Sequence, residues 1–148
     1  MTGPPARTWA EVSLPRIVRN LQAIRYLIGP GVSIAAVVKA NAYGHGALPV
    51  SRRLAAAGVE QLAVSCVEEG VSLREAGIET RILLMGETLS FERDAVFRYG
   101  LTPVVHSLEG LREWNEAAES RRERLSCHCK LETGLNRLGI RASGGALA

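Results

Sequence analysis

An apolar run meets a polar, glycine-punctuated loop in the stretch Val37-Val38-Lys39-Ala40-Asn41-Ala42-Tyr43-Gly44-His45-Gly46. The run from Ile34 to Val38 is too short for a buried helix and too continuously apolar for a half-exposed strand. It favours a strand buried on both faces, as in parallel sheets that helices cover. Lys39 would then lie at the carboxyl end of that strand, where α/β folds place their chemistry. An isolated lysine is ordinarily a solvated charge, but a strand buried on both faces leaves Lys39 no solvated side to reach.

Outward from this stretch, helices alternate with short apolar strands. Apolar residues recur at three- and four-residue steps from Ser13 to Ile28, which predicts a helix that Gly29-Pro30-Gly31 ends. Strands are expected at residues 32–39, 61–67, 81–85, 102–106 and 126–132, and helices at 47–57, around 73–74, at about 91–99 and from 108 to about 125. This alternation indicates right-handed βαβ units and a parallel sheet.

The same alternation fits two α/β architectures, a closed barrel and an open doubly wound sheet. Spacing alone does not separate them. The residues after the first strand contain no Gly-x-Gly-x-x-Gly, so a dinucleotide-binding fold loses support.

Composition and charge narrow the class of protein. The 148 residues suit one domain, 1–148, and 47% hydrophobic with 22% charged residues is typical of a soluble globular chain rather than of disorder. The net charge is +3 and acids are interleaved with the basic residues, so no nucleic-acid partner is expected. No apolar run approaches the roughly 18 residues of a membrane span, so no membrane association is expected.

The cysteines indicate a compartment rather than a metal site. Cys66, Cys127 and Cys129 are an odd number in a sequence that starts without a signal-peptide pattern, so reduced thiols and a cytoplasmic location are expected. Cys127-His128-Cys129 has no second ligand pair at a useful spacing, and neighbouring strand residues point to opposite faces. No metal is expected, and His45 and His128 are interpreted as structural residues or as residues that support the site without contacting a ligand.

A second informative stretch is Lys130-Leu131-Glu132-Thr133-Gly134-Leu135-Asn136-Arg137-Leu138-Gly139. A guanidinium recognises a carboxylate or an oxyanion by its bidentate geometry, which makes Arg137 a candidate binding residue, although it could equally be a surface arginine. Lys130, emerging from a buried strand, needs an acidic partner or a modification. Glu132 lies two residues on and on the same face, so a simple Lys130–Glu132 pair is the alternative.

Both stretches resemble motifs of the bacterial alanine racemases, pyridoxal-phosphate enzymes built on a (β/α)8 barrel. Val-Val-Lys-Ala-Asn-Ala-Tyr-Gly-His-Gly looks like the cofactor-lysine motif, without a gap. The resemblance implies that Lys39 forms the Schiff base with pyridoxal 5'-phosphate and that Tyr43 helps to hold the phosphate. Lys39 would also be the catalytic base on one face of the substrate.

The stretch 130–139 is similar to the family motif that begins with a lysine, runs through Asp-Thr-Gly-Met and reaches an arginine. The resemblance implies that Arg137 hydrogen-bonds the phenolic oxygen of the cofactor and lies beside the substrate carboxylate. It also implies that Lys130 can be carbamylated, which would orient Arg137. Glu132 stands where the family has Asp, and Leu135 where it has Met.

The resemblance extends from about Trp9 to Ile140 and implies a partial (β/α)8 TIM barrel of about five of the eight βα units, with the C-terminal β-domain absent. The implied function is interconversion of L-alanine and D-alanine, which supplies D-alanine for peptidoglycan. In the family, a tyrosine of that β-domain, from the other subunit of a homodimer, acts on the opposite face of the substrate. We therefore expect an incomplete N-terminal part of a racemase that is inactive alone.

Three alternatives remain open. One is a racemase of another small amino acid, such as serine or lysine. A second is a non-catalytic pyridoxal-phosphate-binding barrel protein, which the missing β-domain favours and the two racemase motifs oppose. The third is an inert remnant of a broken gene.

Overall fold

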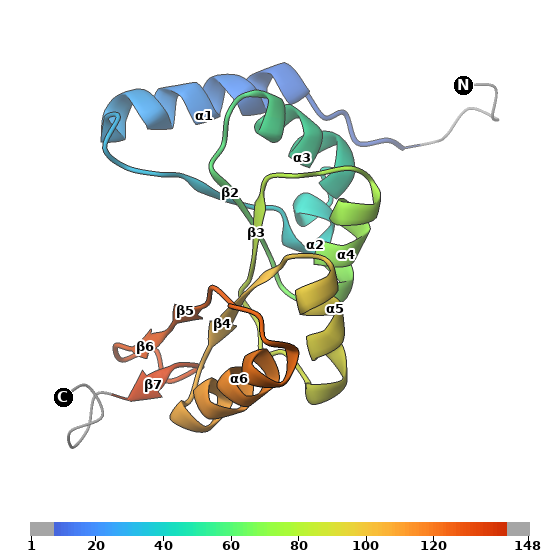
Figure 1. Cartoon of the computed structure of the whole chain (residues 1–148). Helices are drawn as coiled ribbons and strands as arrows, with labels where there is room; N and C mark the ends of the chain where they lie inside the picture. Colours follow the sequence, from blue (N-terminus) through green and yellow to red (C-terminus); the bar gives the residue numbers. More distant parts are fainter. Residues whose placement is uncertain (1–7, 142–148) are drawn as a thin grey trace.

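The computed structural model describes residues 8–141, so the expected start of a further helix in the tail 142–148 lies outside the described residues. Helices and strands alternate along the chain (Figure 1). The order is α1 (Leu14–Ile28), β1 (Ala35–Val37), α2 (Lys39–Tyr43), α3 (Ala47–Ala56), β2 (Gln61–Val64), α4 (Val67–Glu75), β3 (Arg81–Leu84), η1 (Ser90–Glu92), α5 (Arg93–Arg98), β4 (Thr102–Val105), α6 (Leu108–Arg121), β5 (His128–Cys129), β6 (Leu131–Glu132) and β7 (Ile140–Arg141).

Strands β1 to β5 form one parallel sheet in which spatial order follows sequence order. Helices α3, α4 and α5 lie on the same side of this sheet (Figure 1). A doubly wound sheet would reverse its strand order and carry helices on both faces, whereas consecutive strands with helices on one side form the wall of a barrel. The structure thus confirms the predicted α/β fold and is consistent with a partial TIM barrel.

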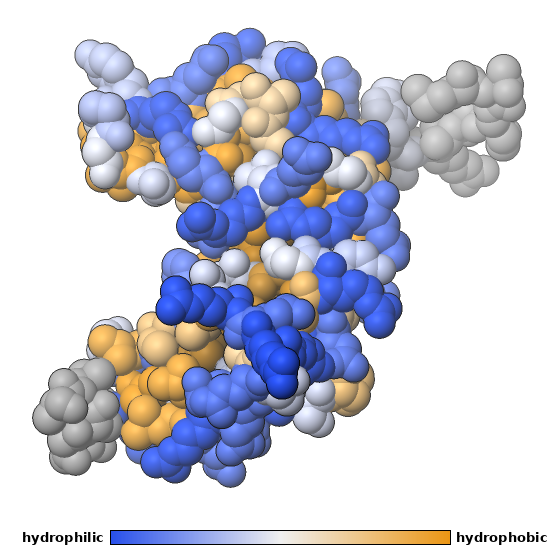
Figure 2. All heavy atoms as spheres, viewed as in Figure 1, coloured by the Kyte–Doolittle hydropathy of each residue, from blue (hydrophilic) through white to orange (hydrophobic). Residues whose placement is uncertain are grey.

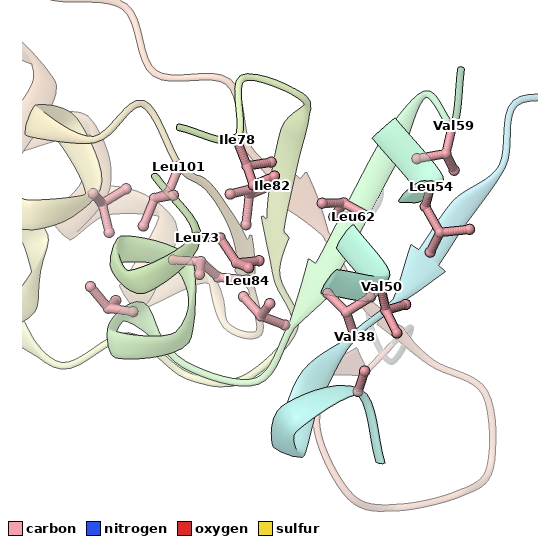
Figure 3. Packing of buried hydrophobic residues seen from close by; sticks show 14 of the residues in the cluster. Val38, Val50, Leu54, Val59, Leu62, Leu73, Ile78, Ile82, Leu84 and Leu101 are labelled. Atoms are coloured by element: carbon pink, nitrogen blue, oxygen red, sulfur yellow. The ribbon is translucent and has the colours of Figure 1, made fainter. Parts of the chain in front are cut away.

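The hydrophobic core lies between the sheet and these helices. Alternate residues of the central strands face the helices, and Leu62, Ile82 and Leu84 are at most 1% exposed. Figure 3 shows them with Leu54 of α3 and Leu73 of α4, which belong to the same cluster. Each such side chain contributes about 1.5–3 kcal/mol when fully buried, so this layer holds the strands against the helices.

The first strand differs from its prediction. It was expected at 32–39 and buried on both faces, but β1 spans only Ala35–Val37, and Ala35 and Val37 are exposed, the latter at 39%. The described residues therefore cover Ala35 and Val37 only in part. Lys39 is accordingly half-buried rather than cut off from solvent.

The fifth strand is also shorter than the expected 126–132, because the chain changes partner at Lys130. The Lys130 N–H donates to the carbonyl of Val105 in β4 (2.9 Å), but its own carbonyl accepts from the N–H of Ile140 in β7 (2.7 Å). The segment therefore divides into β5, paired with β4, and β6, paired with β7. Around β6 and β7 the surface is partly apolar (Figure 2), with Leu131 45% exposed.

None of the helices between residues 8 and 141 has the length and apolar character that crossing a bilayer requires.

Arg74 joins the ends of two helices at the edge of the sheet opposite the strand carboxyl ends. Its guanidinium donates to the carbonyls of Ile78 (2.6 Å), Thr80 (2.7 Å), Tyr99 (2.9 Å) and Gly100 (3.3 Å). Partial burial lowers the pKa of Arg74, the expected effect of desolvation on a cation. These bonds satisfy carbonyls of the two loops that lead from α4 to β3 and from α5 to β4.

We expect Arg74→Met to destabilise the fold by about 2 kcal/mol, because hydrogen bonds from a charged donor are lost while the volume is kept. Urea unfolding followed by circular dichroism measures this. Arg112→Met, at an exposed arginine of α6 with no hydrogen bond among the described residues, is the control and should change stability little. Equal stability of the two variants would contradict the role of Arg74.

Glu60 ties α1 to the start of β1. Its carboxylate accepts from Arg25 of α1 (2.5 and 3.0 Å) and from the N–H of Ile34 (3.0 Å). The hydrogen bond from Arg25, followed by that from Ile34, lowers the pKa of Glu60 from 4.5 to about 2. Because the folded state prefers the ionised carboxylate, this contact stabilises the fold fully above about pH 4.5, and the contribution is lost as the pH falls towards 2.

We therefore expect Glu60→Gln to lower stability at neutral pH and to flatten the dependence of stability on pH between 4.5 and 2. Urea midpoints measured at several pH values test this. Glu116→Gln, at an exposed glutamate of α6, is the control and should follow the parent chain throughout. A Glu60→Gln variant with the parent's pH dependence would refute the linkage.

Candidate active site

The carboxyl ends of the parallel strands surround one cavity of about 470 Å³, a volume in the ordinary range of ligand pockets. The cavity is lined by Lys39, Ser65, Met85, Gly86, Val104, His128, Cys129, Lys130, Arg137 and Leu138. A larger cavity, about 660 Å³, lies against α6 and the residues that follow it, away from the strand ends and without a lysine.

Lys39 and Lys130 are the only two lysines of the 148-residue sequence, and both line this cavity. Arg137 is the third cation of the lining, and no Asp or Glu belongs to it. Three predicted site residues, distant in sequence, are therefore brought together. A concave site with only cationic charge attracts anionic ligands such as phosphates and carboxylates.

Lys39 is placed by a backbone turn of unusual form. Ala40, Asn41, Ala42 and Tyr43 all have left-handed backbone angles, with φ between 50° and 55°. Such angles cost roughly 1–2 kcal/mol per non-glycine residue, so other contacts must hold the turn. Asn41 makes two of these contacts. Its side-chain Oδ1 accepts from the backbone N–H of Ala47 (2.7 Å), and its backbone carbonyl accepts from the N–H of Gly46 (2.9 Å).

Tyr43, the predicted phosphate contact, ends this turn but does not line the cavity. Its side chain is 60% exposed. The structure therefore brings together Lys39, Lys130 and Arg137, and leaves Tyr43 outside that group.

Glu132 shapes the turn that carries Arg137. Its carboxylate accepts from the backbone N–H groups of Gly134 (2.5 Å) and Arg137 (3.2 Å). Backbone hydrogen bonds, from Asn136 first and Gly134 second, lower the pKa of Glu132. Among residues 8–141 no Lys130–Glu132 ion pair forms, so the alternative of a simple pair is not what the structure has.

Sequence reasoning missed several lining residues. His128 was interpreted as structural or as a support behind the site, and it lines the cavity, as do Cys129, Ser65 and Gly86. Gly86 directly follows the expected strand 81–85, which was a usable signal because strand carboxyl ends in such folds carry the site. Ser65 lay inside the expected strand 61–67 and gave no such signal. In residues 8–141, no three His, Cys, Asp or Glu side chains gather so that they could hold a metal ion.

Comparisons with known proteins agree with this geometry. The family described as "Alanine racemase, N-terminal domain" matches residues 12–147. The alanine racemase of Halothermothrix orenii is 40% identical over 134 residues, 90% of this chain and 35% of the relative. Alanine racemase 2 of Bacillus subtilis is 41% identical over 136 residues, 90% of this chain and 34% of the relative. The chain thus spans about a third of the length of these curated relatives.

Solved structures give the same result. Alanine racemase of Clostridium difficile 630 superposes with a TM-score of 0.88 at 37% identity, covering 95% of this chain and 36% of that one. Alanine racemase of Bartonella henselae with covalently bound pyridoxal phosphate superposes with a TM-score of 0.81 at 26% identity, covering 88% and 38%.

We expect Gly86→Ala to destabilise the fold by about 1–3 kcal/mol through overpacking. A Cβ at Gly86 would lie 2.4 Å from the carbonyl oxygen of Ser65, so the ends of β2 and β3 would have to separate. Thermal unfolding measures the loss. Gly31→Ala, where a Cβ meets nothing within 4 Å, is the control, and equal melting temperatures would refute the close approach.

Proposed function

Because the chain belongs to the family of alanine racemase N-terminal domains, we propose that it forms the cofactor-binding part of a racemase that interconverts L-alanine and D-alanine. Residues 1–148 would be the N-terminal part of the barrel domain. The observation that carries the proposal is the single cavity in which the only two lysines meet Arg137.

The residues of the cavity suit pyridoxal 5'-phosphate, on which this family depends. A primary amine is the group that bonds an aldehyde, and Lys39 offers one at the cavity wall. Arg137 is a cation that suits anionic oxygens of a cofactor or substrate. The volume of about 470 Å³ suits a ligand of that size.

Pyridoxal phosphate, when bound, supplies an electron sink that makes the α-proton of an attached amino acid removable. The protein supplies orientation and the groups that move the proton. In the proposed site the amine of Lys39 would hold the cofactor and would be the base that accepts or returns the α-proton on one face of the substrate. Arg137 would bind the substrate carboxylate through its planar guanidinium and would contact the cofactor's phenolic oxygen.

Two further roles rest on the motif match. Lys130, in its carbamylated form, would be an anion that orients the Arg137 guanidinium, and both residues line the cavity. Tyr43 would contact the phosphate, although its exposed side chain lies outside the lining.

The opposite face of the substrate needs a second acid/base, and no tyrosine belongs to the described lining of the cavity. We propose that it comes from the other subunit of a homodimer, as the family resemblance implies. We further propose that this racemase is cytoplasmic and that it supplies D-alanine for peptidoglycan.

The test is reaction of the 148-residue chain with pyridoxal phosphate, reduction with borohydride, and mapping of the label by peptide mass spectrometry. With only two lysines, the ε-amines compete directly. We expect label at Lys39 in the parent chain and in Lys130→Ala, and its loss in Lys39→Ala. The visible absorption of the bound cofactor should be lost with it.

Label distributed equally over Lys39, Lys130 and the α-amino group would contradict the proposal. That result would indicate only the general reactivity of amines with an aldehyde.

A further inference from the structure

Glu69 of α4 bridges the ends of the first two strands with a single carboxylate. Its Oε1 accepts from the backbone N–H of Ala40 (2.6 Å), and its Oε2 accepts from that of Ser65 (2.7 Å). Ala40 follows Lys39, and Ser65 follows β2 and lines the same cavity. Hydrogen bonds to an ionised acceptor are roughly twice as strong as neutral ones, so this bridge is a firm one.

The bond to Ala40 acts on Lys39 through the peptide plane that they share. Because a peptide unit is planar, fixing the Ala40 N–H also fixes the carbonyl of Lys39 and the direction of its Cα. Ala40 is also the first residue of the left-handed turn, with φ 50° and ψ 52°. The Glu69 carboxylate therefore holds the backbone at Ala40, where the chain turns away from the strand, one residue after Lys39.

The bond to Ser65 connects this anchor to the third strand. The Ser65 carbonyl accepts from the N–H of Gly86 (3.1 Å), and both residues line the cavity. A continuous set of hydrogen bonds thus runs from Ala40 through Glu69 and Ser65 to Gly86, across the ends of β1, β2 and β3.

An acid in the first turn of a helix has an ordinary explanation, since it interacts favourably with the helix dipole. Glu68 shares that turn, but it is exposed and makes no side-chain hydrogen bond among the described residues. Only Glu69, half-buried, reaches both amides. The dipole accounts equally for both glutamates, whereas the bridge is particular to Glu69.

We propose that Glu69 is a positioning residue that holds Lys39 in the geometry needed to bond the cofactor aldehyde. This inference rests on the proposed role of Lys39. Glu69 does not line the cavity, so it acts through the backbone rather than on the ligand.

The experiment uses the two lysines as an internal ratio, in buffer free of CO2 and bicarbonate so that Lys130 is present as the free amine. Parent chain, Glu69→Gln and Glu68→Gln are labelled with pyridoxal phosphate and borohydride for short, equal times, and the ratio of label at Lys39 to Lys130 is measured by mass spectrometry. Glutamine offers one acceptor oxygen instead of two and places an NH2 donor against the second N–H. We expect the ratio to fall about tenfold in Glu69→Gln, equivalent to about 1.4 kcal/mol, and to stay unchanged in Glu68→Gln.

A parallel reaction with acetic anhydride separates positioning from loosening of the fold. This small reagent needs no defined geometry, so its Lys39-to-Lys130 ratio should be the same in all three proteins. A merely structural role would expose Lys39 and raise its labelling by both reagents. If Glu69→Gln does not fold, Glu69→Asp replaces it. Aspartate is one methylene shorter and cannot reach both amides, so the same fall in the ratio of label at Lys39 to Lys130 is expected.

The outcomes are distinct. A parent ratio near one overturns both the proposed function and this inference, because there is then no preference for Glu69 to produce. A high parent ratio that persists in Glu69→Gln overturns the inference alone. A ratio that falls equally in Glu68→Gln also overturns it, in favour of a general charge effect.

Discussion

The parallel hydrogen bonding of β1 to β5 is the constraint on which the site depends. In a parallel sheet every strand ends at the same edge, so residues that follow different strands become neighbours. Lys39 and Lys130 meet in one cavity for this reason, although most of the chain separates them. Helices α3, α4 and α5 lie on one side of the sheet (Figure 1), and the cavity lies at the carboxyl ends of the strands.

Local backbone geometry then aims the side chains. After β1 the chain enters a left-handed turn, and at Lys130 it exchanges β4 for β7 as its pairing partner. Neither feature is favourable alone, because left-handed non-glycine residues are strained and a divided strand loses ladder bonds. Side-chain acceptors compensate: Asn41 and Glu69 bind backbone N–H groups around the first turn, and Glu132 does the same in the loop of Arg137.

Sequence patterns predicted where helices and strands lie better than they predicted which residues are exposed and which distant segments pair. The helix 14–28 and the position of Lys39 after a strand follow from local periodicity, glycine stops and apolar runs, and the motifs indicated Arg137. Exposure of Val37 depends on what covers the sheet, and the break at Lys130 depends on a partner strand ten residues later. Glu69 stood beside Glu68 in the sequence with nothing to distinguish them, since its partner Ala40 is distant along the chain.

The placement of acids around the cavity explains how a lysine can be fixed and still remain free to react. A carboxylate paired directly with an ammonium group favours its charged form and would oppose the loss of a proton that nucleophilic attack requires. The structure has no acid in the cavity lining, and among the described residues Lys39 forms no ion pair. Glu69 is instead satisfied by two backbone N–H groups. It can thus restrict where Lys39 lies without neutralising the positive charge that Arg137 presents to an anionic ligand. Anchoring and reactivity are therefore assigned to different groups.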